Sequence, residues 1–282
     1  MAIVLIILQI TGSPFLQNVP TTVLGTGGPD AYGYRWIDSD TAGGPTYNWI
    51  DISGIGTQIT GLADDNVVGP FPIGFDFPYY WYTVNSFFVG SNGYIAFGDN
   101  TLEAAPFPTI PNPAKPNNLL AALMSDLDFT AGSPSAYYWT NNAQDTCIIA
   151  YYNVQFWNVS SSLNTFEIIL SRPDSSITFQ YYTQQGVPYG GWSGALTVGI
   201  ENIAGNVGLQ YNHDQQPSNN AIHDSLAVLF YPPDTTSYQV HDMSVSKVMN
   251  DISGGFFVYN GDPVDFWALI KNTGNQVESG FD

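Results

Sequence analysis

The fold class is set by one stretch of sequence, Phe87-Phe88-Val89-Gly90-Ser91-Asn92-Gly93-Tyr94-Ile95-Ala96-Phe97. Its two apolar runs are rich in aromatic and β-branched residues, which favour strands. The triplet Ser91-Asn92-Gly93 lies between them, and an Asn-Gly pair in this position favours a β-hairpin with a type I′ turn. The stretch therefore predicts two antiparallel strands joined by a tight turn.

Similar strand-like runs, separated by clusters of Gly, Pro, Asn and Asp, continue along the chain. Their spacing of about ten to fifteen residues suits a β-sandwich. One brief run, Asn117–Met124, is the single stretch for which we expect a helix. We therefore expect an all-β protein, an antiparallel β-sandwich. Residues Tyr32–Asp40 are expected to form an aromatic strand that runs into an acidic loop. The other predicted strands are Tyr47–Ile52, Ala136–Trp139, Ile148–Phe156, Phe166–Leu170, Ile177–Tyr182 and Leu196–Ile200.

The charge balance excludes one class of partner. The 282 residues include 24 Asp and Glu but only 5 Lys and Arg, which gives a formal net charge of −19. A polyanion would be repelled, and no basic stripe is present to anchor it, so nucleic acid is excluded as a partner. The lone Cys147 cannot form an internal disulfide, and its apolar neighbours indicate a buried, inert thiol.

The N-terminal segment 1–22 begins with an apolar run that is too short to span a membrane as a helix. Its β-branched residues favour a strand that is apolar on both faces, with a signal segment as the alternative. Such a strand could complete its own sheet or pair with a neighbouring subunit. The residues expected to insert in strand exchange are Ile3, Val4, Ile6, Ile7 and Ile10.

The rest of the chain divides into two predicted units. The sandwich domain is expected at residues 23–235, and the proline-containing stretch Tyr231–Thr236 resembles a linker. Residues 236–282 supply three or four strand-like runs, Met243–Val248, Phe256–Tyr259 and Val264–Ile270 among them. An immunoglobulin-like sandwich needs about seven strands. We therefore expect a second, partial immunoglobulin-like β unit, completed by further sequence or by partner strands.

Residues 71–205 resemble the nidogen-like extracellular domain found in secreted bacterial proteins. The Ser-Asn-Gly hairpin is the most specific matching element, and Trp36–Asp40 with Gly43–Pro45 matches the segment that precedes such modules. The resemblance implies a non-catalytic, adhesive or substrate-presenting role outside the cell. The remaining matching segments are Pro72–Tyr80, Val89–Gly98, Pro106–Pro116, Ser125–Asp128, Ala150–Val154 and Asn164–Leu170.

The C-terminal segment Asp242–Phe281 resembles the opening of a CARDB-type domain, an immunoglobulin-like adhesion module. The match consists of a strand, the turn Gly261–Pro263, and Val264–Gly274. Nidogen-like domains of animals adjoin cysteine-rich modules, which this sequence lacks. The resemblance therefore implies an exported microbial protein.

Three acidic loops are candidates for a calcium site, because calcium prefers several oxygen ligands and alternating aspartates can offer two of them from one turn. The candidate metal ligands are Asp38, Asp40, Asp64, Asp65, Asp126 and Asp128. None of the loops has the EF-hand pattern, and ordinary turn-forming aspartates are the alternative. No other cofactor is expected.

The sequence contains no recognisable catalytic motif, and we expect no enzyme activity. His213, His223 and His241 each precede an aspartate, but adjacent residues on a strand point to opposite faces, so loop positions are expected. Glu167 and Glu201 are the only glutamates within predicted strands, and a glycosidase would need such a pair to face each other.

We therefore expect an extracellular or cell-surface structural protein, joined to copies of itself by β-strand exchange in an adhesive or filamentous assembly. The alternative is a non-catalytic region of a larger secreted hydrolase. Glycans are a further candidate partner, since exposed aromatic side chains such as Trp81, Trp157 or Trp192 could stack on sugar rings.

Overall fold

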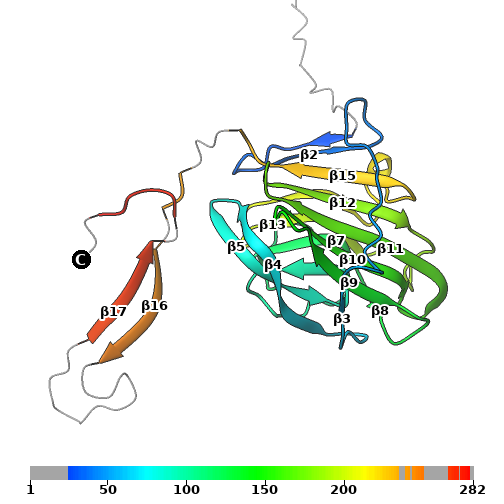
Figure 1. The fold of residues 1–282 in the computed structure, drawn as a ribbon, viewed down its shortest axis with the longest axis horizontal. Coiled ribbons are helices and arrows are strands. Elements are labelled where there is room, and N and C mark those ends of the chain that lie inside the picture. Colours follow the sequence, from blue (N-terminus) through cyan, green and yellow to red (C-terminus); the bar gives the residue numbers. More distant parts are fainter. Residues whose placement is uncertain (1–24, 235–238, 242, 251–265, 273, 280–282) are drawn as a thin grey trace, which may run out of the picture.

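The computed structural model describes residues 25–234, 239–241, 243–250, 266–272 and 274–279. Two antiparallel sheets pack face to face in the main body of the protein (Figure 1). The described residues form no α-helix, and their one helical turn is the 3-10 turn Ser218–Asn220. The predicted all-β antiparallel sandwich is confirmed.

The larger sheet has nine strands in the order β1-β2-β15-β12-β11-β10-β9-β3, with β8 also paired to β10. The strands predicted at residues 136–139, 148–156, 166–170 and 177–182 lie within β9 to β12 and are confirmed. The bounds are β1 Thr26–Gly27, β2 Arg35–Asp38, β3 Thr57–Ile59, β8 Leu127–Asp128, β9 Ser135–Thr140, β10 Thr146–Phe156, β11 Val159–Ser171, β12 Ser176–Thr183 and β15 Leu226–Tyr231.

The smaller sheet has six strands in the order β14-β13-β7-β6-β5-β4. The predicted hairpin is present as β5 and β6, and the strand predicted at residues 196–200 is β13. The bounds are β4 Val67–Tyr79, β5 Tyr82–Gly90, β6 Tyr94–Ala96, β7 Leu119–Ser125, β13 Leu196–Glu201 and β14 Gly208–His213.

The β5–β6 turn differs from the expected type I′ turn. Gly90 pairs with Tyr94, so three residues form the loop, and of these only Gly93 has a positive φ, 76°. A left-handed residue at the end of a three-residue loop is the next most common hairpin connection. A Cβ added to Gly93 would lie 2.1 Å from the carbonyl oxygen of Leu123, so glycine is required here.

The same turn is buried, which is unusual because turns normally lie in water. Ser91 and Asn92 are 0% exposed, so their polar groups must find partners inside the protein. The Asn92 side-chain amide donates to Asp65 Oδ1 and to the carbonyl oxygen of Glu103, each at 2.9 Å, and its Oδ1 accepts the Leu127 N–H at 3.1 Å. Asn92 therefore connects the turn to three separate segments of the chain.

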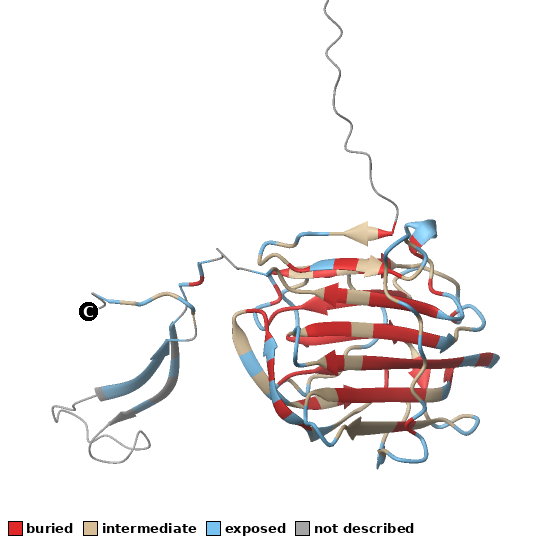
Figure 2. Ribbon diagram, turned by 45° about the horizontal axis from the view of Figure 1, so that its top comes forward, coloured by how far each residue is buried: buried red, intermediate tan, exposed pale blue. Residues whose placement is uncertain are grey.

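Buried tyrosines connect the two layers. The Tyr151 hydroxyl of β10 lies 3.1 Å from the carbonyl oxygen of Gly90 and 2.9 Å from that of Tyr94, one on each side of the turn. The Tyr181 hydroxyl of β12 donates to the carbonyl oxygen of Ala122 in β7 at 2.6 Å. These rings add apolar area to the core and place their polar ends on backbone acceptors of the opposite sheet. Figure 2 shows the buried residues concentrated along the strands of the sandwich.

The helix expected at Asn117–Met124 is wrong, because Leu119–Ser125 is the strand β7. Every residue of β7 is buried, and the strand pairs with β6 on one side and β13 on the other. A short run that is apolar throughout suits a strand covered on both faces as well as a helix, and periodicity cannot separate the two.

The strand expected at Tyr47–Ile52 is also wrong, because this stretch forms no ladder with a neighbouring strand. Its backbone N–H groups bond side chains of the larger sheet instead. Asn48 donates to Gln180 Oε1 at 2.7 Å, Ile50 to Glu167 Oε1 at 3.2 Å, and Ile52 to the Tyr152 hydroxyl at 3.0 Å. We call residues 48–52 the strap, because they lie across the outer face of this sheet.

The C-terminal part of the chain contains a separate two-stranded sheet, formed by β16 Met243–Asn250 and β17 Phe266–Asn272. The strand predicted at Met243–Val248 is confirmed, and β17 covers most of the predicted Val264–Ile270. The run Phe256–Tyr259 and the N-terminal segment with Ile3, Val4, Ile6, Ile7 and Ile10 lie outside the described residues.

Replacing Asn92 tests the importance of the buried turn. We expect Asn92→Ala to lower the free energy of unfolding by about 3 kcal/mol or more, because it leaves several buried polar groups without partners. Chemical denaturation measures this. The control Asn85→Ala, at an exposed position of β5, should change stability by less than about 0.5 kcal/mol. Equal stability of the two variants would contradict the role given to Asn92.

Candidate functional site

The buried turn brings two of the three predicted acidic loops together. Asn66 follows Asp64 and Asp65, and its N–H donates to the Ser91 hydroxyl at 3.0 Å. On the other side, the Ser125 N–H donates to the carbonyl oxygen of Asn92 at 3.1 Å. Asp64, Asp65, Asp126 and Asp128 consequently lie within electrostatic reach of one another, and we call these four residues the acidic cluster.

Burial and mutual repulsion raise the pKa of two carboxyl groups in the acidic cluster. Burial first, and then the negative charges of Asp65, Asp64 and Asp128, together raise the pKa of Asp126 to about 6. Burial, followed by Asp128 and Asp65, raises the pKa of Asp64 as well. Among the described residues, no three His, Cys, Asp or Glu side chains are arranged to hold a metal ion. The calcium site stays a prediction.

The third acidic loop is not part of the cluster. Asp38 is buried in the sandwich, where it accepts hydrogen bonds from Thr41 Oγ1 at 2.8 Å and from the Tyr211 hydroxyl at 3.1 Å. Asp40 is exposed and lies 2.9 Å from His223 Nε2. The two aspartates thus have separate structural partners.

In the described part of the chain, each histidine lies beside one carboxylate, and only His213 has the aspartate that follows it in sequence as this partner. His213 Nε2 is 3.4 Å from Asp214, and His241 Nδ1 is 2.8 Å from Glu278. Asp214 accepts the N–H groups of Gly194, Ala195 and Leu196. Burial alone would raise the pKa of Asp214, but these three donors lower it below its ordinary value.

The two strand glutamates are buried and lie in different sheets, Glu167 in β11 and Glu201 in β13. Burial raises the pKa of Glu167 to about 8 and that of Glu201 to about 7, and backbone N–H donors oppose the shift in each case. Glu167 also accepts from Gln180 Nε2 at 3.0 Å, while its Oε2 has no partner. At neutral pH Glu167 is therefore largely protonated beneath the strap.

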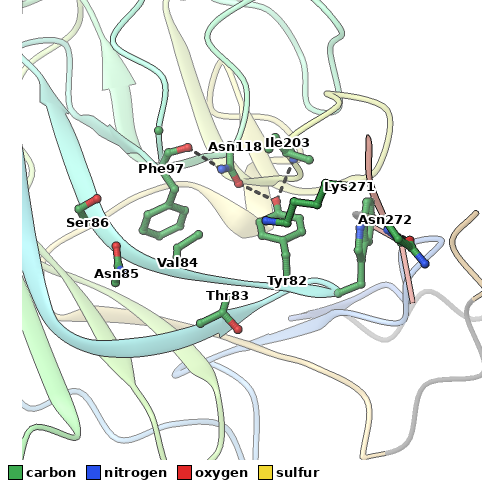
Figure 3. A pocket seen from close by; sticks show the side chains of 13 residues that line it. Tyr82, Thr83, Val84, Asn85, Ser86, Phe97, Asn118, Ile203, Lys271 and Asn272 are labelled. Atoms are coloured by element: carbon green, nitrogen blue, oxygen red, sulfur yellow. Dashed lines mark hydrogen bonds between the residues drawn. The ribbon is translucent and has the colours of Figure 1, made fainter. Parts of the chain in front are cut away.

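A cavity of about 530 Å³ lies between β5 and the C-terminal hairpin. Figure 3 shows Tyr82 on its wall, with the hydroxyl turned towards Asn118 and Ile203. That hydroxyl donates to Asn118 Oδ1 at 2.6 Å and accepts the Ile203 N–H at 2.9 Å. None of the lining residues is Asp, Glu or His, so the cavity wall offers no carboxyl or imidazole group for proton transfer.

The predicted aromatic candidates separate into two kinds. Trp81 and Trp192 are partly buried and pack against the main core. Trp157 is exposed at the β10–β11 turn, beside Tyr189.

The buried Cys147 is confirmed, and burial raises the pKa of its thiol to about 12, so it stays protonated and unreactive.

Comparison with known proteins identifies the family. A family model described as NIDO related matches residues 39–239, more than half of the chain. The chain belongs to this NIDO-related family, which agrees with the nidogen-like resemblance and suggests an extracellular domain. Searches of curated proteins and of solved structures found no match. Among the described residues, no helix is long and apolar enough to cross a membrane.

Glu167 should make stability depend on pH. Its folded-state pKa of about 8 lies above the ordinary 4.5, so between these values the folded protein holds a proton that the unfolded chain has released. The free energy of unfolding therefore falls as pH rises, by up to about 1.4 kcal/mol per pH unit from this group. We expect Glu167→Gln to make this slope shallower in denaturation at pH 5 to 8.

The matched variant Glu167→Leu separates titration from hydrogen bonding. Like Glu167→Gln, it should make the fall of stability with pH shallower. Unlike Glu167→Gln, it should also lower the free energy of unfolding at pH 5, because the Ile50 N–H loses its acceptor. An unchanged slope in Glu167→Gln would contradict a buried, protonated Glu167.

Asp126→Asn should stabilise the protein above pH 6. Because the pKa of Asp126 is raised, ionising this side chain lowers the free energy of unfolding. This cost is absent near pH 3, where the group is protonated, and is complete above about pH 6. Thermal melting should show no gain for the variant at pH 3 and a gain at pH 8. High salt should reduce the gain, because the cluster is partly exposed to solvent. Adding Ca²⁺ to the wild type in the same assay tests the predicted metal site.

Proposed function

We propose that this protein is an extracellular, non-catalytic structural subunit that joins copies of itself by β-strand pairing, as part of an adhesive or filamentous surface assembly. One observation carries the proposal: the hairpin formed by β16 and β17 exposes apolar side chains on both of its faces.

The register shows how these side chains are distributed. Val245 pairs with Ile270, so both lie on one face of the hairpin, and they are 58% and 45% exposed. Trp267 and Leu269 are two residues apart on β17 and lie on the opposite face, at 49% and 56% exposure. Both faces of the hairpin therefore expose apolar area to solvent.

An isolated two-stranded hairpin is only marginally stable in water. Burying a side chain the size of valine, leucine or isoleucine contributes about 1.5–3 kcal/mol, so a strand that covers this hairpin gains substantial free energy. The proposed CARDB-type domain fits the same requirement, because the hairpin would supply two strands of an immunoglobulin-like sandwich that others complete.

The edges of the main sandwich are poor places for such pairing. β1 and β3 are very short, and β4 contains prolines, which cannot donate to a ladder. On β14, the carbonyl oxygen of Gln210 accepts the Trp36 indole N–H at 3.2 Å, and that of Tyr211 accepts from the Asn220 amide at 3.0 Å. The hairpin is the better site for an added strand.

The proposed added strand is the N-terminal segment of a second copy, Ile3 to Ile10. Its sequence is apolar on both faces when extended, which matches a hairpin that is apolar on both faces. Pairing of this kind uses main-chain hydrogen bonds for affinity and side-chain contacts for specificity. With a net charge of −19 on each copy, association depends on these contacts and strengthens when salt screens the repulsion.

Deleting residues 1–17 tests the assembly. Sedimentation analysis should show multimers for the wild type and monomers for the deletion. Leu269→Asp should also give monomers, because it places a charge on the proposed contact face. The control Ile55→Asp, at a loop residue that is 60% exposed, should leave the multimers unchanged. Monomeric wild type, or multimers that survive both changes, would contradict strand exchange.

A further inference from the structure

An exposed aromatic pair lies at one end of the sandwich, away from the core. Trp157 forms the β10–β11 turn, and Tyr189 lies in the loop 184–194. Their ring centroids are 5.4 Å apart and the rings are nearly perpendicular, at 87°. Trp157 is 39% exposed and Tyr189 is 63% exposed. Two large aromatic rings are thus partly exposed to solvent at one place.

The framework holds this pair in position. The Trp157 N–H donates to the carbonyl oxygen of Asp126 at 2.8 Å, which fixes the turn to the acidic loop. The loop 184–194 is bonded near both ends, by the Gln185 N–H to Asn164 Oδ1 at 3.2 Å and by the Gly194 N–H to Asp214 Oδ2 at 2.7 Å. A surface fixed before binding loses little conformational entropy when it takes a ligand.

The surroundings indicate the chemistry of that ligand. Residues 157–163 and 184–194 contain no charged residue, and their exposed polar members are amides and hydroxyls, such as Asn158, Ser160 and Gln185. Sugar rings combine an apolar C–H face with hydroxyl groups at the edge, which suits aromatic faces flanked by neutral donors and acceptors. The net charge of −19 disfavours anionic polymers.

The polar ends of the pair are available for such contacts. In the part of the chain that the structure describes, neither the Trp157 indole N–H nor the Tyr189 hydroxyl makes a hydrogen bond. Both groups can therefore bond sugar hydroxyls. A stable protein–protein contact buries about 1,200–2,000 Å² with a large apolar centre, whereas one aromatic pair among neutral loop residues suits a narrower ligand.

We infer that Trp157 and Tyr189 form a binding site for a neutral polysaccharide, with the rings stacking on sugar faces and the loop amides and hydroxyls bonding sugar hydroxyls. This site is separate from the hairpin proposed for assembly, and the inference does not depend on that assembly.

Affinity electrophoresis of the full chain tests the site, in gels that contain mannan, hydroxyethylcellulose or soluble chitin oligosaccharides, with alginate as an anionic comparison. We expect at least one neutral polymer to retard the protein and alginate not to do so. Trp157→Ala and Tyr189→Ala should each weaken binding about tenfold, which corresponds to about 1.4 kcal/mol. Thermal melting of each variant confirms that it is folded.

The matched control is Tyr182→Ala, which removes another exposed tyrosine, 56% exposed and packed against Trp49. It should bind as the wild type does. Retardation by none of the neutral polymers, stronger binding to alginate, or equal losses in Tyr182→Ala and Trp157→Ala would each overturn the inference.

Discussion

The buried turn at Ser91, Asn92 and Gly93 is the constraint on which the sandwich depends. A turn inside a protein must satisfy every polar group without water, and Asn92 does so by bonding the loops that carry Asp65, Glu103 and Leu127. Tyr151 reaches the same turn from the opposite sheet. One hairpin thus connects the two layers and brings two of the three acidic loops together.

The shortage of lysine and arginine has a structural counterpart. Several acidic side chains accept hydrogen bonds from backbone N–H groups where a more basic protein would use ion pairs. Asp30 accepts three such bonds from residues 32–34, Asp214 accepts three, and Glu167 fastens the strap. Bonds of this kind stabilise loops without a cation, so a chain with 24 acidic and 5 basic residues can still satisfy its turns.

Much of the fold could be predicted from local pattern, and the errors have identifiable physical causes. Strands with alternating or aromatic-rich sequence, such as β9 and β12, were recognisable because strand pairing and burial both favour those residues. β7 was not, since a strand covered on both faces loses its alternation. The stretch Tyr47–Ile52 has strand periodicity, yet its N–H groups bond side chains from β10, β11 and β12. No local sequence feature reveals such distant acceptors.

The sequence by itself determined the all-β class, the hairpin at residues 87–97 and the buried thiol, because these follow from composition and short-range pattern. Only the tertiary structure decided which aspartates lie within electrostatic reach of one another. Asp38 is buried in the sandwich, whereas the loops that carry Asp64 and Asp126 come together at the turn that contains Asn92. It also decided that, of the candidates Trp81, Trp157 and Trp192, it is Trp157 that is exposed. Neighbourhoods of this kind depend on pairing between distant strands, and residue spacing along the chain does not encode them.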